Sequence, residues 1–287
     1  MELAEVHDQL ARLNRSRLAP ALPTNTWRDD VAAEMQLRLL EGDAVETERL
    51  RVGDRAARAP GDVDGFIAWY ERLELDGPGQ GDPLFRWLAE AATLDQMRWF
   101  LHQEVAGEAG FDDLVALTQL KLPDQPKLEL ARNYWDELGR GKATAMHGPM
   151  LERLARSLAL DELAAIPVVW ESHALGNLML AMASNRRYAY HALGALGVVE
   201  LTAPGRAALV NRGLKRLGVT PDTRQYFALH ATLDVQHSIA WNREILRPIV
   251  AAHPAAARAI AEGALIRLEA GRRCFDRYRA ELGVEAR

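Results

Sequence analysis

The sequence predicts an all-α protein, and three observations support this prediction. Apolar residues recur at spacings of three and four over most of the chain, which is the period of a helix and not that of a strand. No Asn-Gly or Asp-Gly turn separates runs of alternating β-branched residues, as β-hairpins would require. Valine and isoleucine are scattered along the chain and do not cluster into strand-like segments.

Amphipathic stretches suited to helices follow one another along the chain. They cover about residues 31–50, 85–106, 111–120, 127–138, 147–160, 169–200, 205–217, 222–250 and 255–282. Proline and glycine mark the expected breaks between these stretches, at Pro60-Gly61, Gly77–Gly81, Pro123–Pro126, Pro167, Pro204-Gly205 and Pro221. The glycine-rich segment at 77–81 is the best candidate for a boundary. We therefore expect an N-terminal helical extension over residues 1–80 and a helical bundle over residues 81–287.

The composition is that of a folded protein without an extreme bias. The chain has 287 residues, 48% of them hydrophobic, and a formal net charge of −5 at pH 7. This balance excludes a disordered, collagen-like or disulfide-rich chain and argues against a nucleic-acid or anionic membrane partner. The first residues lack the order of a signal peptide, and no charge-free apolar run reaches about 18 residues. We expect a cytoplasmic protein with no nucleic-acid and no membrane partner.

The segment 226–237 contains the strongest candidate for chemistry. On a helix, His230, Asp234 and His237 are spaced i, i+4 and i+7, so all three side chains share one face. Two imidazoles and a carboxylate suit a transition metal such as iron or manganese. A surface stripe, or a pair of hydrogen-bonded core histidines, would show the same spacing, and this segment alone leaves the three interpretations open.

Two further segments offer ligands from other helices, as metal sites in helical bundles require. Glu200 ends an apolar run whose glycines favour close helix packing, although a partly exposed helix end is the alternative. Glu137 and His147 would lie about 15 Å apart on an unbroken helix, too far to share an ion. Either Gly139 and Gly141 break that helix, or one of the pair is not a ligand.

In this order the residues resemble a known family. The pattern is Glu137, Gly139, Gly141 and His147, then an apolar stretch ending in Glu200, then Tyr226-Phe227 followed by His230, Asp234 and His237. It is similar to that of the heme-oxygenase-like non-heme di-iron oxidases and oxygenases, also called the iron-containing redox enzyme family, which includes relatives of the chlamydial protein associating with death domains. The resemblance covers about residues 85–250.

The resemblance implies a fold, a cofactor and a reaction class. The fold would be a heme-oxygenase-like helical bundle that holds two non-heme iron ions. The iron ligands would be Glu137, His147, Glu200, His230, Asp234 and His237. The reaction would use O2 to oxidise or oxygenate a small molecule, namely an amine, an amino acid or an aliphatic acid. The resemblance also admits a homodimer.

Three other groups of residues bear on the substrate and on rival functions. Arg186 and Arg187 could bind a substrate carboxylate, because the guanidinium group matches its geometry. Glu104 and Glu108 are one helical turn apart, and we expect them to form a surface pair, with metal ligands or residues that orient such ligands as the alternative. Cys274 is the single cysteine, which we expect to be a small core residue and which cannot form a disulfide within the chain.

Two alternatives to an iron enzyme remain at this stage. The first is a metal-free member of the same fold, either a cofactorless oxidase or a thiaminase-like hydrolase with Cys274 as its nucleophile. The second is a non-catalytic helical interaction protein, in which the histidines and carboxylates form a structural network.

Overall fold

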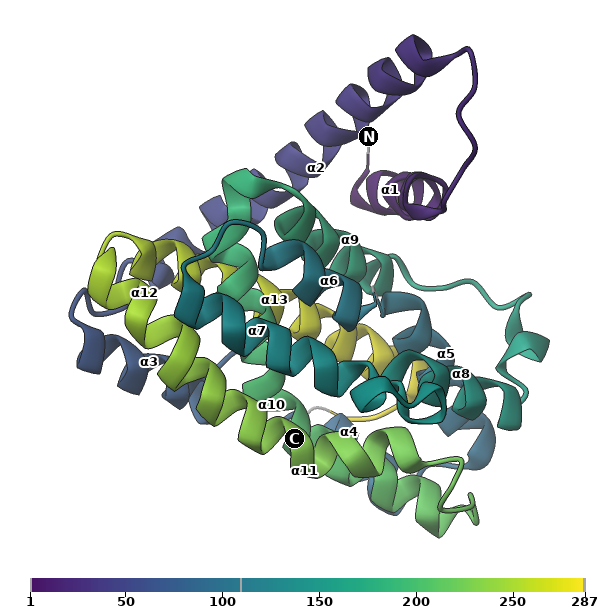
Figure 1. The fold of residues 1–287 in the computed structure, drawn as a ribbon. Helices are drawn as coiled ribbons and strands as arrows, with labels where there is room; N and C mark the ends of the chain where they lie inside the picture. The colour runs from purple at the N-terminus through teal and green to yellow at the C-terminus, as the bar shows by residue number, and fades with distance from the viewer. Residues whose placement is uncertain (1, 109, 286–287) are drawn as a thin grey trace.

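The computed structural model describes residues 2–108 and 110–285, and within them it contains helices and no strand (Figure 1). The helices are α1 (Leu3–Leu18), α2 (Trp27–Ala56), α3 (Val63–Asp76), α4 (Pro83–Glu90), α5 (Leu94–Gly107), α6 (Phe111–Thr118), α7 (Asp124–Glu137), α8 (His147–Ser157), α9 (Trp170–Ser184), α10 (Ala189–Arg216), α11 (Gln225–Ala240), α12 (Arg247–Ala252) and α13 (Ala256–Leu282). A π-helical segment, Trp241–Leu246, joins α11 to α12. The predicted all-α fold class is confirmed.

The centre of the bundle is α10, which packs against α13 and α11 and also contacts α4 and α9. Glycines allow α10 and α13 to approach closely. A Cβ atom on Gly194 would lie 1.9 Å from the Ile260 carbonyl oxygen, and one on Gly263 would lie 1.9 Å from that of His191. By length and composition, Arg186–Arg216 could cross a membrane, but most of this segment is buried among the other helices.

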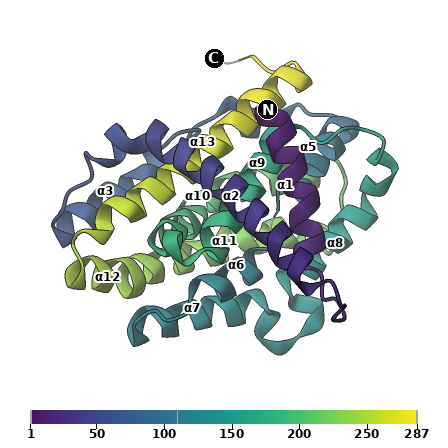
Figure 2. The same cartoon turned by 90° about the horizontal axis from the view of Figure 1, so that it is seen from above.

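The first helices pack on this bundle and do not stand apart from it. Figure 2 shows α1 and α2 crossing one side of the bundle, where α1 contacts α9 and α2 contacts α13 and α9. Val45, Val52 and Tyr70 belong to the same hydrophobic core as the residues of α10 and α13. Residues on both sides of position 80 therefore fill one hydrophobic core. The predicted division into an extension and a bundle at residue 80 stays a prediction.

The start of α2 extends beyond the bundle, as Figure 1 shows. Trp27, Val31, Met35 and Leu39 recur every fourth residue there, and each is more than half exposed. At this spacing the four side chains form one apolar stripe on the helix surface.

Two predicted boundaries are wrong. The stretch 169–200 forms two helices, because Asn185 accepts a hydrogen bond from the Arg187 backbone N–H and begins a short 3-10 turn between α9 and α10. The break expected at Pro204 does not occur, and α10 continues through it. A proline inside a helix costs about 3 kcal/mol. Residues of α10 are buried on both sides of Pro204, among them Leu201 and Val210, and their packing offsets that cost.

Candidate metal centre

A sharp break in the chain brings Glu137 and His147 together. Glu137 is the last residue of α7, and a 3-10 turn at Gly139–Gly141 follows it, with φ of +61° at Gly139 and +82° at Gly141. A Cβ atom on Gly139 would lie 2.4 Å from the backbone of Ala145, so only glycine fits there. His147 begins α8, and its Nδ1 lies 2.6 Å from Oε2 of Glu137. The glycines thus break the helix, as one of the two predicted alternatives required.

The other predicted ligands converge on the same place from α10 and α11. Nδ1 of His237 lies 3.3 Å from Oε2 of Glu200. Ligand atoms of Glu137, His147 and His230 all lie within 4.8 Å of one another, and so do those of Glu137, Glu200 and His237. Glu137 is common to both sets, which we call the two triads. Asp234 belongs to neither triad.

Three atoms that could coordinate a metal are buried here without a hydrogen bond, namely Nδ1 of His147, Nδ1 of His237 and Oδ1 of Asp234. The His147 contact with Glu137 is short, but its geometry is not that of a hydrogen bond. Buried polar atoms rarely stay unpaired, and lone pairs that face one another repel unless a cation lies between them. The residues present therefore fit a bound metal ion.

Hydrogen bonds outside the triads fix which nitrogen of two histidines is free. Nδ1 of His230 lies 2.7 Å from the Tyr226 carbonyl oxygen, which can only accept, so Nδ1 carries the proton and Nε2 is free to bind a metal. Nε2 of His237 lies 3.2 Å from Oδ2 of Asp136, an arrangement that leaves Nδ1 directed at Glu200. Such partners orient histidine ligands in many metal sites.

The pKa values at this place describe carboxyl groups that repel one another beside a histidine, His237, whose pKa Glu200 and Asp136 raise to about 9 against the opposing effect of burial. Burial and the neighbouring carboxylate of Glu200 raise the pKa of Glu137 well above its usual range. Burial, Glu200 and Glu137 also raise the pKa of Asp234. Burial lowers the pKa of His147 and of His230 to about 4, so both imidazoles are neutral at pH 7. A cation would stabilise the mutually repelling carboxylates, and a metal ion bound to His237 would take the place of its proton.

Sequence reasoning missed two side chains that support this site. Asn133 donates a hydrogen bond to Oε1 of Glu200 at 2.6 Å, and Asp136 accepts from His237 while Arg140 donates to its other oxygen. Asn133 lies one helical turn before Glu137 on α7, so the i, i+4 spacing was the available signal.

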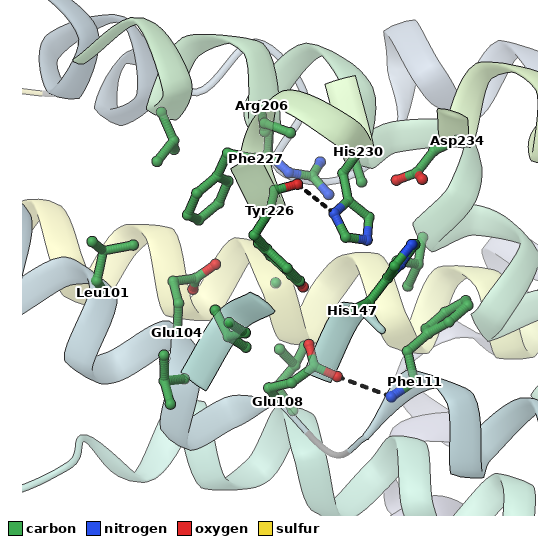
Figure 3. A pocket seen from close by; sticks show the side chains of 18 of the residues that line it. Leu101, Glu104, Glu108, Phe111, His147, Arg206, Tyr226, Phe227, His230 and Asp234 are labelled. Carbon is green, nitrogen blue, oxygen red and sulfur yellow. Dashed lines mark hydrogen bonds between the residues drawn. The ribbon is translucent and has the colours of Figure 1, made fainter. Parts of the chain in front are cut away.

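A cavity of about 190 Å³ opens beside the triads. Figure 3 shows His147, His230 and Asp234 on one side of it, and Glu104, Glu108, Tyr226 and Arg206 around the remainder. A space of similar size can hold benzene in other proteins, so this cavity admits a small organic molecule. The expectation that Glu104 and Glu108 form a surface pair is wrong for Glu104, which is half-buried and lines the cavity, whereas Glu108 is exposed and also lines the cavity.

The two arginines expected to bind a substrate do not line the cavity. Arg186 donates a hydrogen bond to the Thr118 carbonyl oxygen, and Arg187 pairs with Glu46 of α2. Both lie in the short turn between α9 and α10, which contacts other parts of the surface. Arg206 and Arg267 line the cavity in their place.

Cys274 is buried, as expected, and it also lines the cavity. Burial and the nearby Glu104 carboxylate raise the pKa of its thiol to about 12. A cysteine nucleophile reacts as the thiolate, so this environment disfavours the thiaminase-like alternative.

The fold and the site together define a helical protein with a buried cluster of histidine and carboxylate ligands beside a small-molecule cavity. The sequence profile described as "iron-containing redox enzyme" matches residues 98–272. The chain belongs to this family and is an oxidoreductase in the general sense, and the predicted resemblance is confirmed. The matched region contains both triads and begins after α1–α4. A comparison with curated proteins finds no match.

Proposed function

We propose that the protein is an O2-dependent oxidase or oxygenase that uses two non-heme iron ions to act on a small molecule. The observation that carries this proposal is the place of Glu137 in both triads. In carboxylate-rich helical bundles, such inward-facing glutamates hold pairs of metal ions. One ion would bind to His147 and His230, and the other would bind to Glu200 and His237. Glu137 would be a ligand of both ions.

Asp234 completes the proposed ligand set. It lies one helical turn from both His230 and His237 on α11, it is buried, and its Oδ1 has no hydrogen bond. Three carboxylates and three imidazoles suit iron, whereas thiolate ligands, which would favour a structural zinc site, do not contribute. When bound, ferrous iron supplies the electrons with which O2 is reduced.

The protein's own residues would perform three tasks in this reaction. Asp136 and Asn133 hold His237 and Glu200 in fixed orientations, which limits the reorganisation needed when the oxidation state changes. The walls of the cavity keep bulk water away from the reacting atoms. The cavity also places a small amine, amino acid or aliphatic acid next to the triads.

An anaerobic titration with Fe(II) tests the ligand set. We expect two ions per chain in the wild type and consumption of O2 once the loaded protein meets air. The variants His230→Ala and Glu137→Gln should lose this binding, because each removes a ligand atom from a triad. His253→Ala is the matched control, since His253 is an exposed histidine outside the cavity.

Failure of the wild type to bind iron would overturn the proposal, and so would full iron binding by both triad variants. Binding of a single ion would contradict the assignment of Glu137 to two metal ions. Circular dichroism of each variant shows whether a loss of binding reflects a loss of fold.

A further inference from the structure

The outer side of α7 and of the turn that follows it carries positive charge. Figure 2 shows α7 along one edge of the bundle. Between residues 125 and 145 every exposed charged residue is basic, namely Lys127, Arg132, Arg140 and Lys142. The chain as a whole has a formal net charge of −5. The charge of this stretch is therefore opposite to that of the whole molecule.

Apolar side chains share this side of the protein with the charges. Leu128, Arg132 and Trp135 are spaced i, i+4 and i+7 on α7, so they lie on one side of the helix. The turn after α7 packs on the same side, because a Cβ atom on Gly141 would lie 3.0 Å from the Trp135 ring. The neighbours of Gly141 in the chain are both basic. We call Leu128, Arg132, Trp135, Arg140 and Lys142 the basic face.

The basic face is open to solvent. Leu128 is 60% exposed and Trp135 is 52% exposed. The side chain of Arg132 is 67% exposed, whereas that of Glu129, which pairs with it, is 10% exposed. The guanidinium group thus lies outside its carboxylate partner and presents its charge to the surroundings. Arginine and tryptophan are the residue types that are enriched at the centres of protein interfaces.

The basic face lies close to the triads without taking part in the cavity. Nε of Arg140 donates to Oδ1 of Asp136 at 2.6 Å, and Oδ2 of Asp136 lies 3.2 Å from Nε2 of His237. The side chain of Arg140 is 68% exposed and that of His237 is 7% exposed, so two contacts lead from the surface to a triad residue. No residue of the basic face lines the cavity, and a protein bound there would leave the cavity free for a small molecule.

The proposed reaction needs electrons from outside the substrate. Hydroxylation of a substrate RH follows RH + O2 + 2e− + 2H+ → ROH + H2O, in which two electrons come from a separate donor. A carrier of single electrons must bind and leave twice in each turnover. Interfaces for such brief encounters are small, and complementary charges make association fast. A basic face above the triads meets these requirements, because electron transfer slows steeply with distance.

We propose that the basic face is the docking surface for an acidic protein that carries single electrons. Trp135 is the apolar anchor, and Arg132, Arg140 and Lys142 face carboxylates of the partner. This inference rests on the proposed function, because it supplies the electrons of the O2 reaction. In each turnover two molecules of the reduced carrier lose one electron each and leave oxidised, and two protons come from water.

Isothermal titration calorimetry of the full metal-free chain tests the docking with two probes. A plant-type [2Fe–2S] ferredoxin is an acidic carrier of single electrons, and cytochrome c is a basic one. We expect ferredoxin to bind at low ionic strength and cytochrome c not to bind. The affinity for ferredoxin should fall at least about tenfold at high ionic strength, because salt screens exposed charges.

Variants assign the binding to the basic face. The double variant Arg132→Glu with Lys142→Glu should weaken ferredoxin binding at least about tenfold, because it places like charges opposite one another. Trp135→Ala should also weaken it, since the anchor is lost. The matched control is Arg212→Glu with Lys215→Glu, which makes the same two charge reversals at exposed residues of α10. Circular dichroism of each variant checks the fold.

Rapid mixing measures the transfer of electrons. The iron-loaded chain is exposed to O2, made anaerobic again and mixed with reduced ferredoxin, whose visible absorbance reports its reoxidation. We expect the double variant on the basic face to slow this reoxidation at least about tenfold at low ionic strength. It should take up Fe(II) like the wild type, because neither substituted residue belongs to a triad.

Failure of ferredoxin to bind, equal binding of cytochrome c, or wild-type affinity or reoxidation rate in the double variant on the basic face would overturn the inference. Self-association of the wild type that this double variant abolishes would also overturn it, since the face would then belong to a second copy of the chain. The calorimetry uses metal-free protein, so a failure of docking is distinct from a failure to take up iron, which would refute the proposed function.

Discussion

Two places in this protein bury histidine beside glutamate, and they are electrostatic opposites. At the first, the triads, ligand atoms lie within 4.8 Å of one another, and Nδ1 of His147 and Nδ1 of His237 are buried without a hydrogen bond. At the second, Glu262 of α13 lies 3.0 Å from His191 and accepts hydrogen bonds from Arg49 at 2.7 Å and from Arg258 at 3.1 Å. Both are built from the same residue types on packed helices.

The pKa values of the two glutamates show what this difference means. Burial would raise the pKa of Glu262, but its bonds with Arg49, His191 and Arg258 lower it below the usual value. At Glu137, burial and the repulsion of Glu200 act together, and the pKa lies well above the usual value. A buried carboxylate that accepts hydrogen bonds from arginines keeps its charge in the folded protein, whereas one that lies beside another carboxylate is suited to bind a cation.

The largest expected effect separates the two places by iron affinity. Glu137→Gln should weaken Fe(II) binding on the order of 100-fold or more, because it removes a shared ligand. Glu262→Gln should leave binding within about twofold, since Glu262 does not line the cavity. Anaerobic equilibrium dialysis with metal analysis measures both. Similar losses of Fe(II) affinity in the two variants would contradict the assignment of the metal site to the triads alone.

The next effect is a difference in the sign of the stability change. In the metal-free protein, Glu262→Ala should lower the free energy of unfolding by about 2 kcal/mol, because it removes the acceptor of Arg49 and the partner of the buried His191. Glu137→Gln should raise it at pH 7, where a carboxyl group with a raised folded-state pKa destabilises the native state. Urea unfolding of both variants checks these signs, and a loss of stability in Glu137→Gln would contradict the second.

Iron should stabilise the protein through the triads alone. At a free Fe(II) concentration of 100 times the dissociation constant, the expected gain is about 2.7 kcal/mol. Anaerobic thermal unfolding should show this gain in the wild type and in Glu262→Gln, but not in His230→Ala. A gain that survives in His230→Ala would place the iron elsewhere.

The smallest effect concerns a buried histidine outside both places, His7 of α1, whose ring stacks on Trp170 with the ring centres 5.9 Å apart. Burial and the charge of Arg273 lower its pKa to about 4. The unfolded chain binds a proton near pH 6.5 that the folded protein does not, so stability falls as the pH drops from about 6.5 toward 4. We expect His7 to account for about 2 kcal/mol of the loss between pH 7 and pH 5.

Urea unfolding at the two pH values measures this contribution. The loss should be smaller by about that amount in His7→Asn and unchanged in His253→Ala, whose histidine is exposed. An unchanged loss in His7→Asn would show that protonation of His7 does not govern the docking of α1.

The predicted fold class follows from local patterns that survive packing. The helical period between residues 111 and 138 appears as α6 and α7, and the glycines at 139 and 141 break the chain where one prediction required it. Glu200 is 2% exposed, in accord with the interpretation that the small residues before it favour an interior position. Each of these features depends on residues close together in the sequence.

Other parts of the site depend on residues far apart. The sequence of α5 is equally compatible with Glu104 facing solvent or a cavity. Only tertiary packing, with α5 against α9 and with Phe100 on Tyr278 of α13, places Glu104 in the cavity. Arg206 and Arg267 are 61 residues apart in number, and neither segment indicates that both line one cavity. Arg186 and Arg187 had a suitable chemistry but lie on a turn that the fold directs elsewhere.

The sequence by itself determined the helices and the order of the candidate ligands, because helical period, glycine breaks and i, i+4 spacing are local properties. Only the tertiary structure decided that Glu137 joins both triads and that Glu262, of the same residue type, is paired with arginine and histidine. The physical reason is that the charge state of a buried group depends on which distant residues surround it.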